Sequence, residues 1–133
     1  MNDPFAFIPR RVRMLLFAVT TGAVAFVSLW PRSYVDEYVS PEVQSQDHFI
    51  HLGCFLAHGF CTLWAWGRRE RPWRSRLAVF AGCALFGLAL EVLQKLPAVG
   101  RSFQWGDVQQ NTLGAALAAF LLPRLFWPAG RDM

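Results

Sequence analysis

Long apolar stretches separated by short charged segments dominate the chain. Four windows of about 17 to 20 residues hold almost no ionisable side chains, and an α-helix of that length crosses a hydrocarbon core of about 30 Å. A soluble helical bundle would carry polar residues around more than half of each helix. The pattern therefore predicts four membrane-spanning helices, over residues 14–30, 49–66, 77–93 and 108–127.

The composition supports this prediction. The chain has 133 residues, of which 54% are apolar and 17% charged, and a soluble domain this small buries too little surface to hide so much apolar area. We expect one domain over residues 1–133, an all-α, integral membrane four-helix transmembrane bundle. A secretory signal is the alternative for the first window, but its apolar run is long and no small-residue cleavage site follows Trp30.

The positive charges collect on one side of the predicted spans. Lys and Arg total 13 against 9 Asp and Glu, a formal charge of +4. The positive-inside rule then places both termini and the loop at residues 67–76 in the cytoplasm. The cytoplasmic positives are Arg10, Arg11, Arg13, Arg68, Arg69, Arg71, Arg74, Arg76, Arg124 and Arg131. Because topology accounts for these charges and no nucleic-acid module is present, we expect no nucleic-acid partner.

Three groups of polar residues stand out in and beside the predicted spans, and each group falls on one face of its helix. They are Asp47, His51, Cys54 and His58 in the second span, Glu91 and Gln94 in the third, and Asp107 and Asn111 in the fourth. Exposing such groups to lipid is costly, so we expect those near the outer ends to converge. His58 lies deeper, where a hydrogen bond between helices is its ordinary role. The small residues Gly87, Gly114 and Ala118 are expected to bring the third and fourth spans close together.

Three segments carry a family resemblance. Residues 47–52 resemble the Asp-Lys-x-x-His-Phe start of the VanZ-like family, with His48 in the place of the lysine. Residues 87–94 resemble its Gly-x-x-x-Glu-x-x-Gln segment, and residues 101–114 resemble its Arg, Asp, Asn and Gly ending. The resemblance implies a small multi-pass protein of the bacterial inner membrane. The family is named for low-level teicoplanin resistance and implies no settled reaction.

The polar cluster leads to a first hypothesis, an outward-facing site for an amphiphilic cell-envelope ligand. A membrane lipid or a lipid-linked envelope precursor would fit it, and teicoplanin resistance would follow from such a role. The candidate catalytic residues are His51, Glu91 and Asp107, with His51 as general acid or base. The candidate ligand-binding residues are Asp47, Gln94, Arg101 and Asn111. Whether the protein is an enzyme is left open.

Two other interpretations use the same residues. A metal site of Asp47, His51 and Glu91 is possible, but His58 is two turns from His51, about 10 Å, and cannot share the ion; we expect no metal and no cofactor. Alternatively, the cluster is a structural network in a non-catalytic accessory protein, with Glu91 paired to Arg101 and Asp107 paired to His48 or His51. A transporter would require oligomerisation, and the oligomeric state is left open.

Overall fold

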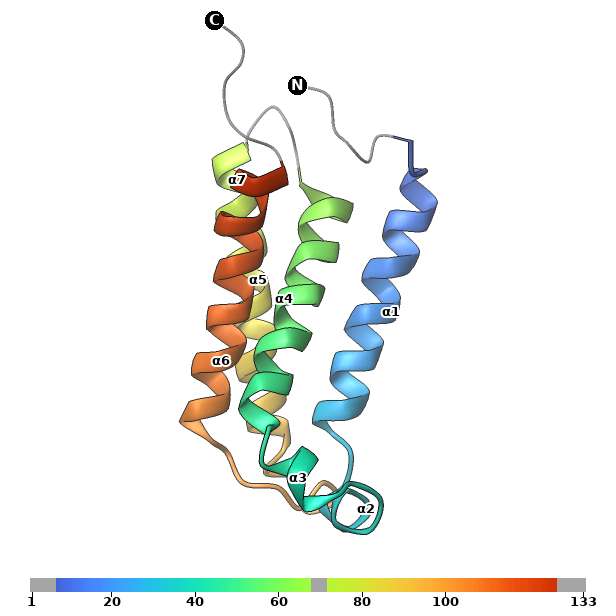
Figure 1. Cartoon of the computed structure of the whole chain (residues 1–133), viewed down its shortest axis with the longest axis vertical. Coiled ribbons are helices and arrows are strands. Elements are labelled where there is room, and N and C mark those ends of the chain that lie inside the picture. The colour runs from blue at the N-terminus through green and yellow to red at the C-terminus, as the bar shows by residue number, and fades with distance from the viewer. Residues whose placement is uncertain (1–6, 68–71, 127–133) are drawn as a thin grey trace, which may run out of the picture.

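The computed structural model describes residues 7–67 and 72–126, and in these ranges the chain is helical and contains no β-strand. The predicted all-α fold is confirmed. The long segments run side by side (Figure 1). They are α1 Arg10–Ser28, α4 Asp47–Trp66, α5 Pro72–Leu93, and a continuous run of α6 Trp105–Ala116, η1 Leu117–Leu121 and α7 Leu122–Phe126.

Three helices are long and apolar enough to cross a membrane. α1, α4 and α5 contain 19, 20 and 22 residues, and at 1.5 Å per residue each reaches about 28 to 33 Å. Large apolar side chains point away from the protein interior; Phe26, Phe49 and Leu85 are 65%, 71% and 66% exposed. Water would make this surface costly, whereas hydrocarbon accommodates it. The first three predicted spans overlap these helices, which begin four, two and five residues earlier than predicted.

The predicted fourth span corresponds to a helical rod that changes character part-way. Its first 12 residues are α-helical, the next five form the π-helical segment η1, and α7 follows without a break. Pro123 explains the change, because it has no N–H to donate to the carbonyl four residues earlier and its ring would clash there. A wider π turn relieves both problems. Membrane crossing by this rod stays a prediction, and Trp127 lies outside the described residues.

α4 is the central helix, packed most extensively against α6 and also against α1 and α5, whereas α1 barely touches α5. Small residues permit the close approach of α4 and α6. A Cβ added to Gly114 would lie 2.6 Å from a backbone oxygen of α4, and one added to Gly59 would lie 2.8 Å from the Ala118 Cβ. Gly87 of α5 faces α6, because a Cβ added to it would lie 3.0 Å from the Asn111 Cβ. The prediction that Gly114 and Ala118 face the third span is therefore wrong: their stripe is directed at the second.

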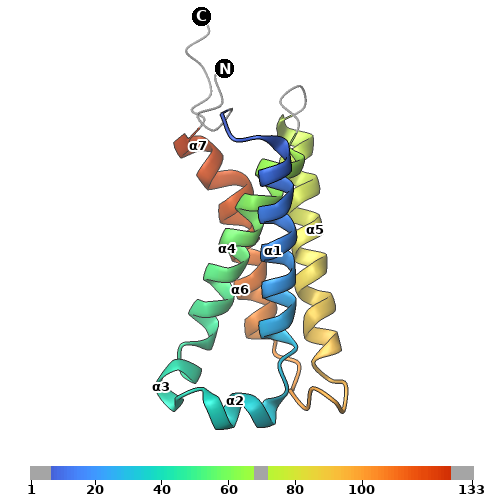
Figure 2. The same ribbon diagram turned by 90° about the vertical axis from the view of Figure 1, so that its right-hand side faces the viewer.

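Two short helices, α2 Arg32–Tyr38 and α3 Pro41–Gln44, lie across one end of the molecule, here called the α2 end (Figure 2). The sequence predicted only a loop at residues 31–48. A side-chain hydrogen bond from Gln44 Nε2 to the Val39 carbonyl, 2.8 Å, holds the two helices together. The second connection at this end turns at Gly100, whose φ of +63° is one that glycine adopts without strain.

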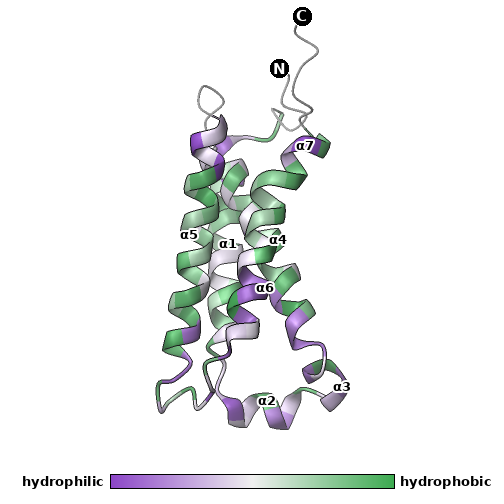
Figure 3. Ribbon diagram, turned by 90° about the vertical axis from the view of Figure 1, so that its left-hand side faces the viewer, coloured by the Kyte–Doolittle hydropathy of each residue, from purple (hydrophilic) through white to green (hydrophobic). Residues whose placement is uncertain are grey.

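Hydrophilic residues gather at the two ends and on α6, and the remaining lengths of the long helices are mostly hydrophobic (Figure 3). α1 begins and α7 ends at the end opposite α2 (Figure 1). The described arginines predicted to be cytoplasmic all belong to segments at that end: Arg10, Arg11, Arg13, Arg74, Arg76 and Arg124. Arg68, Arg69, Arg71 and Arg131 lie outside the described residues. The arrangement agrees with the charge pattern, while the side of the membrane on which each end lies stays a prediction.

Candidate functional site

His51 is held in one orientation by a partner on α6. Its Nδ1 lies 2.9 Å from Oδ1 of Asn111, and both residues are buried, at 7% and 1% exposure. An amide oxygen only accepts hydrogen bonds, so Nδ1 carries the hydrogen of this contact. In the neutral ring, Nε2 is then left with a free lone pair. The contact joins the second turns of α4 and α6 and fixes the direction in which this lone pair points.

Two carboxylates flank the Nε2 atom of His51. Asp47 Oδ1, one turn earlier on α4, and Asp107 Oδ2, on α6, each lie 3.7 Å from it. Asp107 is 1% exposed, and its Oδ2 accepts no hydrogen bond from the described part of the chain. Its Oδ1 lies 3.0 Å from Nδ1 of His48. His48, the residue in the place of the family lysine, therefore orients a carboxylate of the site from the exposed surface.

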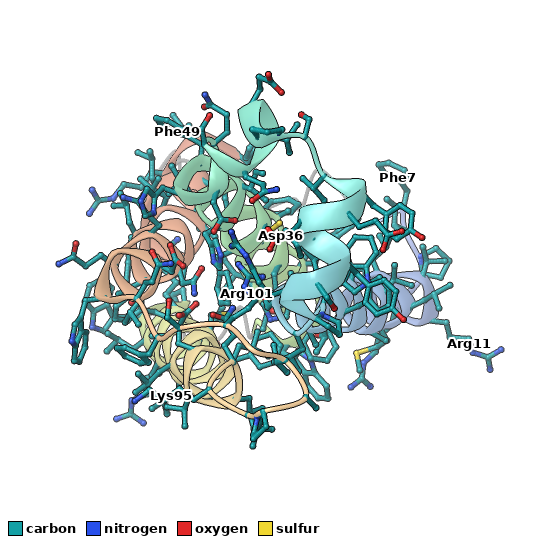
Figure 4. The ribbon with its side chains drawn as sticks, turned by 90° about the horizontal axis from the view of Figure 1, so that it is seen from below. Phe7, Arg11, Asp36, Phe49, Lys95 and Arg101 are labelled. Carbon is teal, nitrogen blue, oxygen red and sulfur yellow. The ribbon has the colours of Figure 1, made fainter. Side chains whose placement is uncertain are left out.

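Arg101 joins the same group from the connection between α5 and α6. Its Nη2 lies 3.5 Å from Asp47 Oδ2, and its Nη1 donates to the Ser28 carbonyl at 3.4 Å. Seen from the α2 end, Arg101 lies inside the ring of helices, whereas Lys95 lies at its edge (Figure 4). The ion pair predicted between Glu91 and Arg101 is replaced by one with Asp47, because α1 ends beside Arg101 and its last carbonyls draw the guanidinium toward that side.

Glu91 and Gln94 form the α5 side of the cluster. Glu91 Oε2 accepts from the Gln104 backbone N–H at 3.3 Å, while its buried Oε1 receives no hydrogen bond from the described residues. Gln94 Nε2 donates to the Ser28 carbonyl at 3.0 Å. Glu91 lies close enough to Asp107, His51 and Arg101 for their charges to act on it, so acidic and basic groups face one another in this layer.

A small cavity of about 20 Å³ opens beside His51, between α1 and α4. Val24, Val27 and Ile50 are among the residues of its apolar wall, and Asp47, His51 and Arg101 form its polar end. A volume of this size holds about one water molecule. The cavity therefore presents a charged end and an apolar wall to anything that approaches between the two helices.

One subset of these residues has the arrangement of a metal-binding group. Asp47, His51 and Asp107 each offer a ligand atom, and the three atoms lie within 4.8 Å of one another. The metal site considered from the sequence consisted of Asp47, His51 and Glu91, whereas in the structure the third residue of the group is Asp107. This exchange follows from the packing, because α4 lies closer to α6 than to α5 and Glu91 is directed at the Gln104 amide.

The predicted convergence of the outer polar residues is confirmed. The structure brings together Asp47, His51, Asp107, Asn111 and Arg101, with Glu91 and Gln94 on the adjoining side. The roles assigned to them, catalytic or ligand-binding, stay predictions. Ser28 and Gln104 were missed, because they contribute backbone atoms and no sequence signal marks those.

His58 lies apart from this cluster and has the role expected of it. Its Nδ1 is 3.4 Å from the Thr20 hydroxyl of α1, and its ring stacks on Phe17 and contacts Phe86. These contacts link α4 to α1 and α5. They make His58 a packing residue and leave His51 as the buried histidine beside the carboxylates.

Apolar helices of membrane length around a buried set of carboxylates indicate a membrane protein, since such groups survive in lipid only when they face one another or a cavity. Within that class the sequence gives a family: residues 4–127 match VanZ/LLP1, and the chain belongs to this family. The match covers every residue of the candidate site. No curated protein and no solved structure gives a significant match to the chain.

Proposed function

We propose that the protein is a multi-pass component of the bacterial inner membrane, with both termini in the cytoplasm and the α2 end facing outward. On this proposal the rod from α6 to α7 is a fourth span. The charge pattern supports the orientation, since six of the eight described arginines belong to segments at the opposite end. The candidate site then lies in the outer leaflet, at the depth of lipid head groups.

We further propose that this site binds, or acts on, the head group of an amphiphilic cell-envelope molecule. The observation that carries the proposal is the cavity between α1 and α4, which joins an apolar wall to a polar end containing Arg101 and His51. A lipid reaching it sideways would lay its chains along α1 and α4 and its anionic group near Arg101, which is suited to phosphate and carboxylate. His51 Nε2 supplies a basic lone pair that can accept a proton or coordinate a cation. Glycopeptide resistance would follow if the molecule were an envelope precursor.

The alternative is that the cluster only fixes the packing of the helices. Two contacts favour it: the Gln94 amide is used on the Ser28 carbonyl, and the Asn111 oxygen on His51. Both residues were predicted to bind ligand, yet each has these groups bonded within the protein. Polar contacts between membrane helices commonly stabilise a fold without any further role.

The two proposals differ in what Arg101→Gln should do. Purify the wild-type protein and the variant in native lipid discs, identify the retained lipids by mass spectrometry, and measure teicoplanin susceptibility in cells. A ligand site predicts loss of one lipid class and a changed susceptibility. Lys95→Gln is the matched control, because it removes a positive charge from the edge of the same end. A variant that melts lower but retains the same lipids and susceptibility would support the structural network and refute the ligand site.

A further inference from the structure

We propose that Asp47, His51 and Asp107 bind one divalent transition-metal ion, and that Zn²⁺ matches their donor set best. The inference rests on the proposed function in one respect, since it takes the cluster to be a ligand site and not only a structural network. From the sequence alone we predicted no metal. The geometry of these three side chains is the reason for departing from that expectation.

The spacing of the donor atoms fits a metal ion with little movement. His51 Nε2 lies 3.7 Å from Asp47 Oδ1 and 3.7 Å from Asp107 Oδ2. In a tetrahedral zinc site with bonds of about 2.0 to 2.1 Å, neighbouring ligand atoms are about 3.4 Å apart. These two separations need to close by only a few tenths of an ångström. The separation between the two carboxylate oxygens is at most 4.8 Å, so it closes by no more than about 1.4 Å, a movement that rotations of the two aspartate side chains share.

The surrounding hydrogen bonds are those that orient metal ligands. A ligating histidine usually gives its second ring N–H to a carbonyl or carboxylate, which fixes the ring and makes the other nitrogen a better ligand. Asn111 Oδ1 has this position on His51. His48 does the same for Asp107 by contacting Oδ1 and leaving Oδ2 directed at the site. Arg101 approaches Asp47 at Oδ2, so Oδ1 stays available as a ligand.

Electrostatics gives the second, independent observation. Asp107 Oδ2 is buried and receives no hydrogen bond from the described residues, and it faces the lone pair of His51. When ionised, Asp47 and Asp107 carry −2 beside His51, and Arg101 returns +1 through its contact with Asp47. Asp107 is the buried one of the two, and a buried carboxylate oxygen without a partner is strongly unfavourable. A divalent cation bound to His51 and both aspartates would supply that partner.

The donor set selects among cations. Imidazole suits Zn²⁺ and other transition metals, whereas Mg²⁺ and Ca²⁺ prefer all-oxygen ligands. Three protein ligands also leave a coordination position on the ion. That position explains how so acidic a cluster accommodates an anionic head group, because the phosphate or carboxylate would meet the cation and Arg101 and not the aspartates alone.

The test is direct metal binding by the purified full-length protein. Strip the protein with a chelator in detergent, titrate Zn²⁺, Mn²⁺ and Mg²⁺ by calorimetry, and count bound metal by elemental analysis. We expect about one Zn²⁺ per chain, bound more tightly than Mn²⁺ and far more tightly than Mg²⁺. Asp107→Asn and His51→Gln should each weaken Zn²⁺ binding at least tenfold. Asp47→Asn gives the same test at the most exposed ligand, where folding is least at risk.

Two matched controls exclude other ligands. His58→Gln removes the buried histidine outside the cluster, and Asp36→Asn removes a surface carboxylate at the same end; both should bind Zn²⁺ as the wild type does. Absence of stoichiometric Zn²⁺ on the wild type overturns the proposal, as does unchanged binding in the ligand variants. A thiolate charge-transfer band after Co²⁺ substitution would overturn it too, because it would place the ion on the cysteines.

The same samples separate this inference from the proposed function. If Zn²⁺ binding fails but lipid retention still depends on Arg101, the metal site is refuted and the head-group site stands. If Zn²⁺ binds as described while Arg101→Gln retains the wild-type lipids, the metal site stands and the head-group site is refuted.

Discussion

Replacing Gly114 by alanine tests the packing that holds the site together. The added Cβ would lie 2.6 Å from the Leu52 carbonyl oxygen, 2.9 Å from the Leu56 nitrogen and 3.0 Å from the Phe55 Cβ. Two of these neighbours are backbone atoms of α4, so no side-chain rotation relieves the contact. Restoring an ordinary separation of 3.4 Å from the Leu52 oxygen moves the helices apart by about 0.8 Å.

This displacement lowers the stability of the Gly114→Ala variant. A radial gap of this size forfeits a quarter to a half of the attraction between the contacting atoms, and overpacked cores lose about 1 to 3 kcal/mol. On the scale known for domains of this length, the melting temperature should fall by roughly 4 to 12 °C. The same separation lengthens the 2.9 Å contact between His51 and Asn111, so the site should weaken together with the fold.

Thermal unfolding in detergent, followed with a thiol-reactive dye, measures this effect. Cys83 is 2% exposed, so in a background where the partly exposed Cys54 and Cys61 are replaced by alanine, the dye reacts only when the helices separate. Gly53→Ala is the matched control on α4, since a Cβ there meets nothing within 4 Å. It should melt at or slightly above the wild-type temperature, because alanine favours helix. A Gly114→Ala protein that melts like the wild type, or a Gly53→Ala protein that falls as far, would refute the reasoning.

Three further experiments test other contacts. Asn111→Leu leaves the His51 Nδ1–H buried without its acceptor and should lower the free energy of unfolding by about 1 to 3 kcal/mol in a denaturation series; an unchanged value would contradict the hydrogen bond. His58→Phe should cost less than about 1.5 kcal/mol in the same assay, because an aromatic ring of similar size keeps its stacking. Arg32 and Asp36 form an exposed pair at 3.0 Å, and a double-mutant cycle should give a coupling below about 1 kcal/mol; a larger value would show that the pair is better ordered than its exposure indicates.

The sequence predicts the helices well because lipid imposes a simple rule on them. An apolar run of membrane length has few alternatives to a helix, so α1, α4 and α5 follow from composition alone. The polar stripe on α4 also follows, since a spacing of four residues returns to the same face. Asp47 and His51 are on one side of that helix in the structure, as the spacing requires.

The partners of each polar group are not predictable in the same way. They depend on which helices lie next to each other and at what distance, and the sequence does not state either. Arg101 therefore pairs with Asp47 where Glu91 was expected. The predicted pairing of Asp107 with His48 or His51 is confirmed, and Asp107 contacts both histidines. Ser28 matters through its carbonyl oxygen, an atom that every residue possesses.

The π-helical segment at Leu117–Leu121 acts as a phase shift along the last rod. A π turn holds about one residue more than an α turn, so the residues after it face roughly 100° away from the positions that a regular helix would give them. The stripe from Asp107 through Asn111 to Ala118 is thus uncoupled from the face that α7 presents. A substitution on the polar face of α6 therefore does not require a compensating substitution on α7. Deletion of one residue within η1 would restore a regular α-helix and place the two halves in a single helical register.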